Sequence, residues 1–293
     1  MSKHMIVLGG GESGVGAALL GHQLGYKVFV SDKGTIGTSF QKELDDHQIQ
    51  WEQGQHTAAQ ILQADLVIKS PGIPSDIPIV EAIRSAEIPL LSEIEFASLH
   101  TDAELIGITG TNGKTTTAML THHLLASAGK SVALAGNIGE SFAKAITTNS
   151  PDYWVLELSS FQLEDILSFH PRYAVMTSLT PDHLDRYNNS FDRYVDAKFC
   201  MLKNQTEEDY FIYDDTDDEI KLALERHKPK SQRIPYTDKK IKDKRFNSID
   251  MIRIDNPSFE GIHNSKNAMA AATIAQLVNI RKQTIRESLQ TFK

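Results

Sequence analysis

The sequence predicts an α/β protein with two parallel sheets. Short apolar runs typical of buried strands alternate with helix-like segments along the chain, which is the pattern of parallel βαβ units. Two glycine-rich loops, starting near residues 9 and 110, each follow such a run and open a helical segment. The 293 residues suffice for two domains. We expect residues 1–92 and 93–293 to form them, with the boundary in the stretch 91–103.

The first series of elements occupies about ninety residues. Its strands are short apolar runs that end in glycine, aspartate or proline, and its first helix is stopped by Gly25. The predicted strands are Met5–Leu8, Lys27–Ser31 and Leu66–Ile68, and the helix is Val15–Leu24.

The second series begins near Glu104. Its expected strands are Leu105–Thr109, Val132–Leu134, Trp154–Leu158 and Tyr173–Thr177. Its expected helices are Thr115–Ser127, Phe191–Leu202, Ala268–Val278 and Lys282–Phe292. We interpret the acidic stretch 214–219 as a solvated turn and helix start in preference to a metal site, because aspartate favours helix N-termini.

Composition excludes several classes of protein. The formal charge of −8 argues against a nucleic-acid-binding surface. The single cysteine, Cys200, rules out an internal disulfide and fits a reducing cytosol. Since no apolar run is long enough to span a membrane, we expect a cytoplasmic protein, which we take to be a monomer.

The first glycine loop reads G-x-G-x-x-G at Gly9, Gly11 and Gly14, between a strand and a helix, and Asp32 ends the next strand. Such glycines let the backbone approach a pyrophosphate, and the helix N-terminus provides N–H groups. The spacing predicts a Rossmann-like domain with a nucleotide site. It fits NAD, another nucleotide, or tight packing of strand against helix alone.

The second glycine loop runs from Ile108 to Thr116. Its backbone amides, Lys114 and the Thr115 hydroxyl are the groups with which P-loops hold ATP phosphates and Mg²⁺. The loop departs from G-x-x-x-x-G-K-[ST], because Ile108 stands at the first glycine and Gly110 lies closer to Gly113. We predict a P-loop ATPase domain of the α/β class.

Two polar side chains follow strands of the second series. Glu157 ends the run 154–158, and His183 lies in a loop after Tyr173–Thr177. Ligands of such sheets bind at the carboxyl ends of the strands. We therefore expect Glu157 to hold Mg²⁺, which prefers oxygen ligands, and His183 to be functional; a surface glutamate and a structural histidine are the alternatives.

Lys198 is unusual because it lies in an apolar stripe of the helix 191–202, together with Phe191, Tyr194 and Phe199. It is either buried for a function or extends its ammonium to solvent at the edge of the stripe. Asn264 precedes an alanine-rich helix, where it serves either as an N-cap or in nucleotide recognition.

Together these motifs resemble those of the Mur ligases, which build the peptide of bacterial peptidoglycan. The similarity covers nearly the whole chain and favours the member that adds D-glutamate to UDP-N-acetylmuramoyl-L-alanine. It is carried by Thr109–Thr115, Gly136–Gly139, Leu156–Glu164, Asp182–Tyr187 and His263–Asn264.

The resemblance implies roles for individual residues. The UDP of the precursor would contact Glu12, Ser13, Asp32, Ser70, Pro71 and Gly72. ATP would contact Gly110, Thr111, Asn112, Gly113, Lys114, Thr115 and Thr116, with Asn264 and Asn267 on the adenine side. The muramoyl-alanine portion would lie near Asn137, Ser159 and Gln162. One Mg²⁺ would bind Thr115 and Glu157, and a second His183 and a carbamylated Lys198. Lys114, His183 and Lys198 would be the catalytic residues.

The implied reaction is ATP-dependent amide formation through an acyl phosphate. The resemblance also implies a third, C-terminal domain with most of the D-glutamate contacts, so we expect these 293 residues alone to be inactive in ligation. The alternatives are another Mur-type or folylpolyglutamate-type ligase, an NAD-dependent oxidoreductase and a UDP-sensing module without catalysis. The second glycine loop disfavours the oxidoreductase, and the leading domain disfavours folylpolyglutamate synthases.

Overall fold

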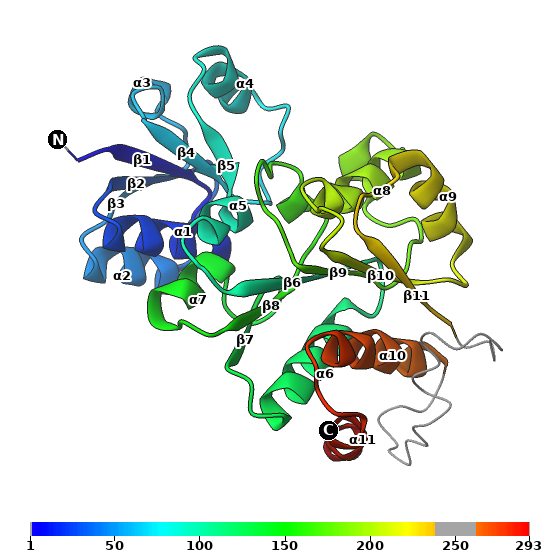
Figure 1. The fold of residues 1–293 in the computed structure, drawn as a ribbon. Helices are drawn as coiled ribbons and strands as arrows, with labels where there is room; N and C mark the ends of the chain where they lie inside the picture. Colours follow the sequence, from blue (N-terminus) through cyan, green and yellow to red (C-terminus); the bar gives the residue numbers. More distant parts are fainter. Residues whose placement is uncertain (1, 238–261, 293) are drawn as a thin grey trace. The chain divides into compact units, whose positions relative to one another are not determined.

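The computed structural model describes residues 2–237 and 262–292. They form an α/β fold with two sheets whose paired strands all run parallel (Figure 1). The chain divides into two compact units that alternate along the sequence. The first unit holds residues 1–101, 139–150 and 161–169, and the second holds 102–138, 151–160 and 170–293. Each glycine loop therefore opens a sheet of its own, as the predicted fold class requires.

The sheet of the first unit has the strand order β3-β2-β1-β4-β5. Its strands are β1 (His4–Leu8), β2 (Lys27–Asp32), β3 (Gln50–Gln53), β4 (Leu66–Lys69) and β5 (Leu90–Ser92). Its helical segments are α1 (Glu12–Gln23), α2 (Thr38–Asp46), α3 (Ala58–Ile61), α4 (Pro78–Ser85), α5 (Glu93–Ser98), α7 (Phe142–Thr148) and the 3₁₀ turn η1 (Phe161–Leu163). Helix α5, which starts at the predicted domain boundary, belongs to this unit.

Helix α1 is the central helix of the first unit. All residues from Gly14 to Gly21 are buried, as expected for a helix that is apolar all round. Gly16 lies against Ser141 and Lys144 of the α7 segment, where a side chain would find no room. Small residues thus let α7, which comes from much later in the chain, pack closely on α1. A second apolar cluster joins β1 and β4 to α3 and α4 through Ile6, Leu8, Ile61, Val67, Val80 and Ile83.

The sheet of the second unit has the order β11-β10-β9-β6-β8-β7. Its strands are β6 (Glu104–Thr109), β7 (Val132–Gly136), β8 (Tyr153–Glu157), β9 (Tyr173–Met176), β10 (Tyr210–Asp214) and β11 (Gln232–Tyr236). Its helical segments are α6 (Lys114–Ser127), η2 (Leu184–Tyr187), α8 (Phe191–Phe199), η3 (Cys200–Leu202), α9 (Asp218–His227), α10 (Ile262–Leu277) and α11 (Lys282–Thr291).

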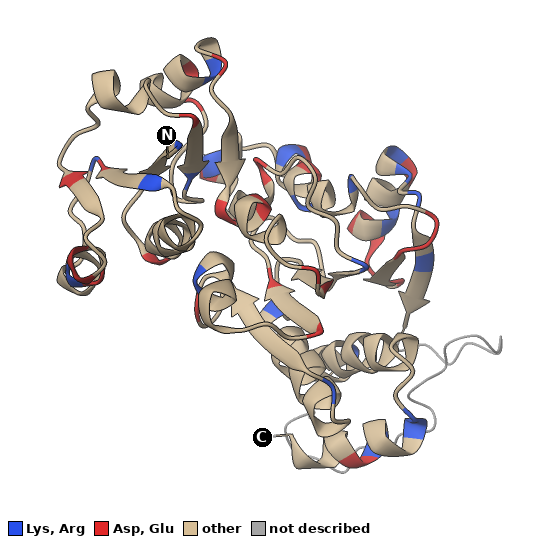
Figure 2. Ribbon diagram, turned by 60° about the vertical axis from the view of Figure 1, so that its left-hand side comes forward, with Lys and Arg blue, Asp and Glu red and all other residues tan. Residues whose placement is uncertain are grey.

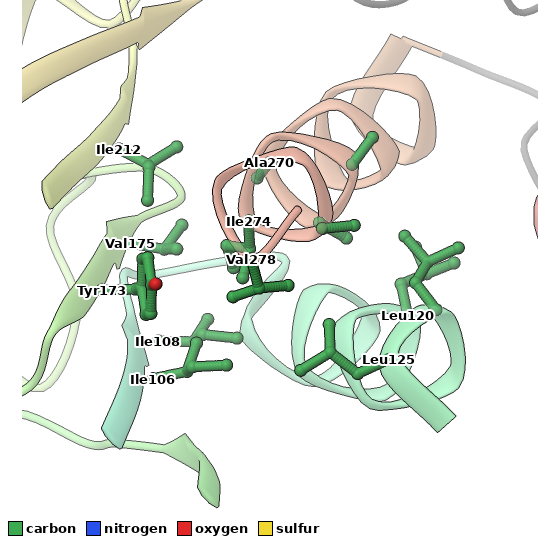
Figure 3. Packing of buried hydrophobic residues seen from close by; sticks show 14 of the residues in the cluster. Ile106, Ile108, Leu120, Leu125, Tyr173, Val175, Ile212, Ala270, Ile274 and Val278 are labelled. Carbon is green, nitrogen blue, oxygen red and sulfur yellow. The ribbon is translucent and has the colours of Figure 1, made fainter. Parts of the chain in front are cut away.

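The main core of the second unit lies between the sheet and the helices α6 and α10 (Figure 3). Ile106 and Ile108 of β6 and Ile274 of α10 are fully buried. Each such aliphatic side chain contributes about 1.5–3 kcal/mol through burial. Because β6 is central in the sheet and runs directly into the second glycine loop, this core fixes the base of that loop.

Charged residues of both signs are interspersed in the view of Figure 2. The acidic stretch begins with Asp214, a buried residue whose carboxylate pairs with Lys266 at 2.8 Å. Asp217 is the N-cap of α9 and accepts hydrogen bonds from the backbone N–H groups of Glu219 and Ile220. The turn and the helix start at Asp217 are confirmed, whereas Asp214, which ends β10, is buried and not solvated as expected. Over the described ranges 2–237 and 262–292, no helix is long and apolar enough to cross a membrane.

Candidate functional site

The second glycine loop connects β6 to α6, and its neighbours hold it in a fixed shape. Gly113 is the residue before α6 and has a φ of 84°, in the left-handed region that favours glycine. Residues that follow β9 bind the loop backbone: the Thr177 hydroxyl donates to the Asn112 carbonyl at 2.6 Å, and the Asn112 N–H donates to the Ser178 hydroxyl at 3.0 Å. The helix N-terminus is thus presented as an anion site.

Lys114, the first residue of α6, folds back over this loop. Its ammonium donates to the carbonyl oxygens of Gly110 at 3.0 Å and Thr111 at 2.8 Å. Burial lowers the pKa of Lys114, whereas the negative charges of Glu157 and Asp182 act in the opposite direction. The Lys114 ammonium thus lies beside the helix N-terminus, and a phosphate bound there would be stabilised by both.

Lys198 on α8 is buried, with 2% of its surface exposed. The interpretation of a lysine that reaches solvent is therefore wrong. Its ammonium donates to the Gly110 carbonyl at 2.8 Å and lies 4.7 Å from the centre of the Tyr194 ring. Burial, and then the positive charge of Lys114, lower the pKa of Lys198 to about 7, against the opposing effect of Asp182.

Glu157 ends β8 and is 2% exposed, so it is not a surface glutamate. Its two carboxylate oxygens have different donors: the Thr115 hydroxyl at 2.8 Å and the Asn137 amide at 2.8 Å. The structure thus brings together three residues that the sequence singled out. A buried carboxylate and a hydroxyl beside a phosphate site are the hard oxygen ligands that Mg²⁺ prefers, so the donor set fits this ion.

His183 lies in the loop after β9 in the left-handed region, with φ 49°. Its side chain is 57% exposed, and its imidazole Nε2 lies 3.6 Å from a carboxylate oxygen of Asp182. Within the described part of the chain, no three His, Cys, Asp or Glu side chains are grouped as a metal site. A second Mg²⁺ held by His183 and a modified Lys198 stays a prediction.

Two asparagines that the sequence singled out lie on α10. Asn267 is buried, and its amide oxygen occupies the space that a side chain at Gly113 would need. It therefore lies directly beside the glycine loop. Asn264 is half-buried and lies inside α10, which begins at Ile262. The N-cap interpretation of Asn264 is wrong, because the helix starts before it.

In the first unit, the glycine loop joins β1 to α1. A side chain at Gly14 would collide with the Gly9 carbonyl oxygen, which explains the glycine at that position. The Asp32 carboxylate accepts hydrogen bonds from the N–H groups of Gly10 at 2.6 Å and Gly34 at 2.7 Å. Asp32 thus joins the glycine loop to the turn that follows β2.

The other predicted precursor contacts lie at the same ends of the strands. Ser70 follows β4, is buried, and its hydroxyl donates to the Gly9 carbonyl at 3.4 Å. Pro71 and Gly72 continue this loop, and Ser13 is half-buried in the first turn of α1. Glu12, which begins α1, accepts a hydrogen bond from the Ser141 N–H at 3.1 Å. Their contact with the UDP portion of the precursor stays a prediction.

Ser159 and Gln162 belong to different units. Ser159 is half-buried after β8 and lies in the second unit, whereas Gln162 is buried in η1 and lies in the first.

The sequence analysis did not identify a set of buried charged residues near η1 and α7. They are Lys69, Glu93 and Glu95, and Asp165 forms an ion pair with Lys69. A charged residue next to apolar residues in the sequence is the pattern that could have revealed them.

Two family models match the chain. The model of the Mur ligase middle domain matches residues 108–275, and the model of the MurD N-terminal domain matches residues 5–78. The first match includes the second glycine loop, Glu157, His183, Lys198 and both asparagines. The second includes the first glycine loop, Asp32 and Ser70.

Relatives and solved structures agree with these matches. The chain is 46% identical to the UDP-N-acetylmuramoylalanine–D-glutamate ligase of Christiangramia forsetii, over all of this chain and 68% of the relative. It is 43% identical to the ligase of the same name from Bacteroides fragilis, over 99% of this chain and 68% of the relative.

The fold is similar to that of the UDP-N-acetylmuramate:L-alanyl-γ-D-glutamyl-meso-diaminopimelate ligase of Neisseria meningitides. The TM-score is 0.69 at 20% identity, over all of this chain and 99% of that one. It is also similar to that of the UDP-N-acetylmuramate-alanine ligase of Thermotoga maritima, with a TM-score of 0.59 at 22% identity, over 99% of this chain and 68% of that one. With a family model that matches more than half of its residues, the chain belongs to the Mur ligase family.

Proposed function

We propose that this chain binds UDP-N-acetylmuramoyl-L-alanine and ATP, and that it serves the ATP-dependent addition of D-glutamate to that precursor in peptidoglycan synthesis. The observation that carries the proposal is a glycine loop whose carbonyl oxygens bind Lys114, next to the hydrogen bond from Thr115 to Glu157, in a member of the Mur ligase family. The relatives at 43–46% identity carry the name of the D-glutamate ligase. We place the protein in the cytoplasm, as a monomer.

The proposed reaction has two steps. The terminal carboxylate of the precursor attacks the γ-phosphorus of ATP; an O–P bond forms, the bond to the β-phosphate oxygen breaks, and ADP leaves. The amine of D-glutamate then attacks the acyl carbon of this acyl phosphate. A C–N bond forms, the nitrogen loses a proton, and the C–O bond to phosphate breaks with release of inorganic phosphate.

In this scheme Lys114 offsets the negative charge that develops on the transferred phosphoryl group. The loop backbone between Gly110 and Thr116 orients the phosphates. Thr115 and Glu157 would hold Mg²⁺, which supplies charge neutralisation at the phosphate oxygens when bound. Asn137 keeps the Glu157 carboxylate in place through its 2.8 Å hydrogen bond. Asn264 and Asn267 are assigned to the adenine side of the nucleotide.

Lys198 is assigned a different role, as a carbamate that would serve a second Mg²⁺ with His183. The neutral amine adds to CO₂, an N–C bond forms, and a proton is released, so that a cation becomes an anionic oxygen ligand. Because burial lowers the pKa of Lys198 to about 7, the neutral amine is far more accessible near neutral pH than in an ordinary lysine, whose pKa is about 10.4. Burial thus supports the modification chemically.

The first unit is assigned to the precursor. Its glycine loop, with Glu12, Ser13 and Asp32, would bind the UDP portion together with Ser70, Pro71 and Gly72. Asn137, Ser159 and Gln162 would lie toward the muramoyl-alanine portion. NAD is disfavoured as the ligand, because the chain has a family match to the MurD N-terminal domain over residues 5–78.

Calorimetry tests this proposal directly. UDP-N-acetylmuramoyl-L-alanine should bind the chain with one-to-one stoichiometry, and NAD should give no heat of binding. ATP with Mg²⁺ should bind independently of NAD. Binding of NAD in place of the UDP-linked precursor would refute the assignment of the first unit, and a failure to bind ATP would refute that of the second.

A further inference from the structure

The segment 161–169 has an unusual position in the fold. It follows β8 and Ser160 of the second unit and precedes β9 of the same unit, yet it packs within the first unit. Two residues of the first unit that contact it are charged and almost fully buried: Lys69 and Glu95 are each 1% exposed. Burial of a charge is costly unless it has partners, so these contacts must be specific.

Glu95 on α5 binds the end of this segment. Its carboxylate accepts hydrogen bonds from three successive backbone N–H groups, those of Leu167 at 3.0 Å, Ser168 at 2.8 Å and Phe169 at 2.8 Å, and also from the Ser168 hydroxyl. A carboxylate with this many donors satisfies its charge locally. The last three residues of the segment are therefore fixed to α5.

Lys69, the last residue of β4, binds the middle of the segment. Its ammonium lies 2.9 Å from a carboxylate oxygen of Asp165 and donates to the Ile73 carbonyl at 2.9 Å. The other oxygen of Asp165 pairs with Arg84 at 3.2 Å. Residues 70–72 lie between Lys69 and Ile73, so one ammonium braces this loop and the Asp165 turn at the same time.

Lys69 contacts two segments, and the proposed function assigns both of them to binding of the precursor. The loop 70–72 is assigned to the UDP end, and Gln162, three residues before Asp165, to the muramoyl-alanine end. A buried ion pair contributes little stability beyond that of apolar residues of similar size, but it holds two loops at one distance.

We propose that Lys69 is a positioning residue, which through Asp165 sets the spacing between the loop 70–72 and the turn that carries Gln162. The two ends of the UDP-linked precursor are then recognised at a fixed separation. This inference rests on the proposed function of the first unit. It predicts that the pair affects binding of the whole precursor more than binding of its UDP portion.

Hydrogen exchange of the full chain tests the positioning without any ligand. In Lys69→Met and Asp165→Asn, the peptide spanning 161–169 and the Ser92 amide, which donates to the Asp165 carbonyl at 3.3 Å, should exchange faster by about tenfold or more, because local opening becomes easier. Lys221→Met, which removes an exposed lysine paired with Asp218, should leave both unchanged. Unaltered exchange in the two test variants would overturn the inference.

Calorimetry with two ligands tests the consequence. Lys69→Met should weaken binding of UDP-N-acetylmuramoyl-L-alanine by about tenfold or more, since small misplacements of binding groups are costly, and should weaken binding of UDP by much less. Lys69→Arg should restore most of the affinity, because it keeps the cation. An equal loss for both ligands, or no loss for either, would contradict the proposal.

The double variant Lys69→Met/Asp165→Leu distinguishes a loss of positioning from a loss of folding. It replaces the pair with apolar side chains, so its melting temperature should be close to that of the unaltered protein, and its preference for the whole precursor over UDP should still be lost. A folded double variant with full preference would overturn the inference. If the unaltered protein fails to bind the precursor, the proposed function is wrong, whereas the exchange result still decides the positioning role.

Discussion

Lys114 and Lys198 donate hydrogen bonds to the same atom, the carbonyl oxygen of Gly110, at 3.0 and 2.8 Å. One lysine comes from the start of α6 and the other from α8, so side chains of both helices bind the loop through this one carbonyl oxygen. The positive charge of Lys114 is one cause of the lowered pKa of Lys198. Burial lowers the pKa of both lysines, and it lowers that of the more deeply buried Lys198 to about 7.

In an enzyme that also carries the C-terminal domain implied by the resemblance, we expect Lys114→Ala to abolish most ATP-dependent turnover while the fold is retained. The lysine follows a strand and opens a helix, and its contacts are with loop carbonyls, so its loss removes charge compensation and little packing. The rate should fall by roughly a hundredfold or more, measured as ADP release at saturating precursor. Lys221→Ala, on the exposed face of α9, is the matched control, and near-normal turnover of the Lys114 variant would exclude the assigned role.

Lys198 should carry a carbamate when ATP and Mg²⁺ are bound. In protein supplied with ¹³C-bicarbonate, a carbamate carbon signal should appear and should be absent from Lys198→Arg. That variant keeps a cation but cannot form the modification, so in the enzyme with its C-terminal domain it should be inactive. Lys198→Ala should recover partial activity with short carboxylates, which occupy the vacated space.

Lys203→Arg is the control for this experiment, since it changes an exposed lysine just beyond the same helix. An unmodified Lys198 in a complex with ATP and Mg²⁺ would disprove the carbamate. An unmodified lysine without metal would not, because nothing would then stabilise the anion.

Glu157→Gln should weaken Mg²⁺-dependent ATP binding by about tenfold or more, which corresponds to about 1.4 kcal/mol. Glutamine still accepts the Thr115 hydroxyl but lacks the charge that attracts the ion. Calorimetric titration of ATP at several Mg²⁺ concentrations measures the effect. Glu104→Gln removes an exposed carboxylate at the start of β6, the other end of the sheet, and should bind ATP normally; equal behaviour of the two variants would rule out a metal role for Glu157.

Glu93→Gln should change the pH dependence of stability. Burial, opposed by the hydrogen bond from Ala143 and assisted by the charge of Glu12, raises the pKa of Glu93 from 4.5 to about 7. Between these values the folded state holds a proton that the unfolded state has lost, so the free energy of unfolding falls as pH rises through this window. The full cost, on the order of 3 kcal/mol as an upper limit, is present above pH 7.

The glutamine variant has no such titration. It should therefore melt at a higher temperature than the unaltered protein at pH 8, and the difference should shrink as the pH is lowered toward 4.5. Thermal unfolding at both pH values measures this. A difference that is constant with pH would show that Glu93 is ionised in the folded protein at all of these values.

Much of the fold was predictable from the sequence. Both glycine loops and the strands that precede them follow from apolar runs that end in glycine, and both are confirmed. The sequence also indicated that Glu157 lies at a strand end and that Lys198 lies in an apolar stripe, because these are local patterns. The strands β3, β5, β10 and β11 were not predicted. The edge strand β3 reads Gln-Trp-Glu-Gln and carries no apolar run, and β11 contains Pro235, which is typical of an edge.

The contacts of the buried charges could not be predicted. Glu93 and Glu95 alternate with Ile94 and Phe96, a pattern that fits a half-exposed helix as well as a buried one. Their partners, near Ala143 and Leu167, lie some fifty and seventy residues further along the chain. Only the folded arrangement shows that carboxylates on α5 accept hydrogen bonds from backbone N–H groups of distant segments.

The alternation of the two units along the sequence has a consequence for modularity. Each unit consists of three chain segments, so the chain passes from one to the other five times. A gene fragment that ended at residue 101 would encode a Rossmann-like sheet without α7, and the carboxyl groups of Glu93 and Glu95 would lose the backbone N–H partners that lie beyond it. Neither unit is therefore encoded by one continuous segment that could be exchanged as a whole. Recombination between homologues within this region would have to preserve compatible pairs at α5, α7 and the 161–169 segment, so the two units are expected to be inherited together.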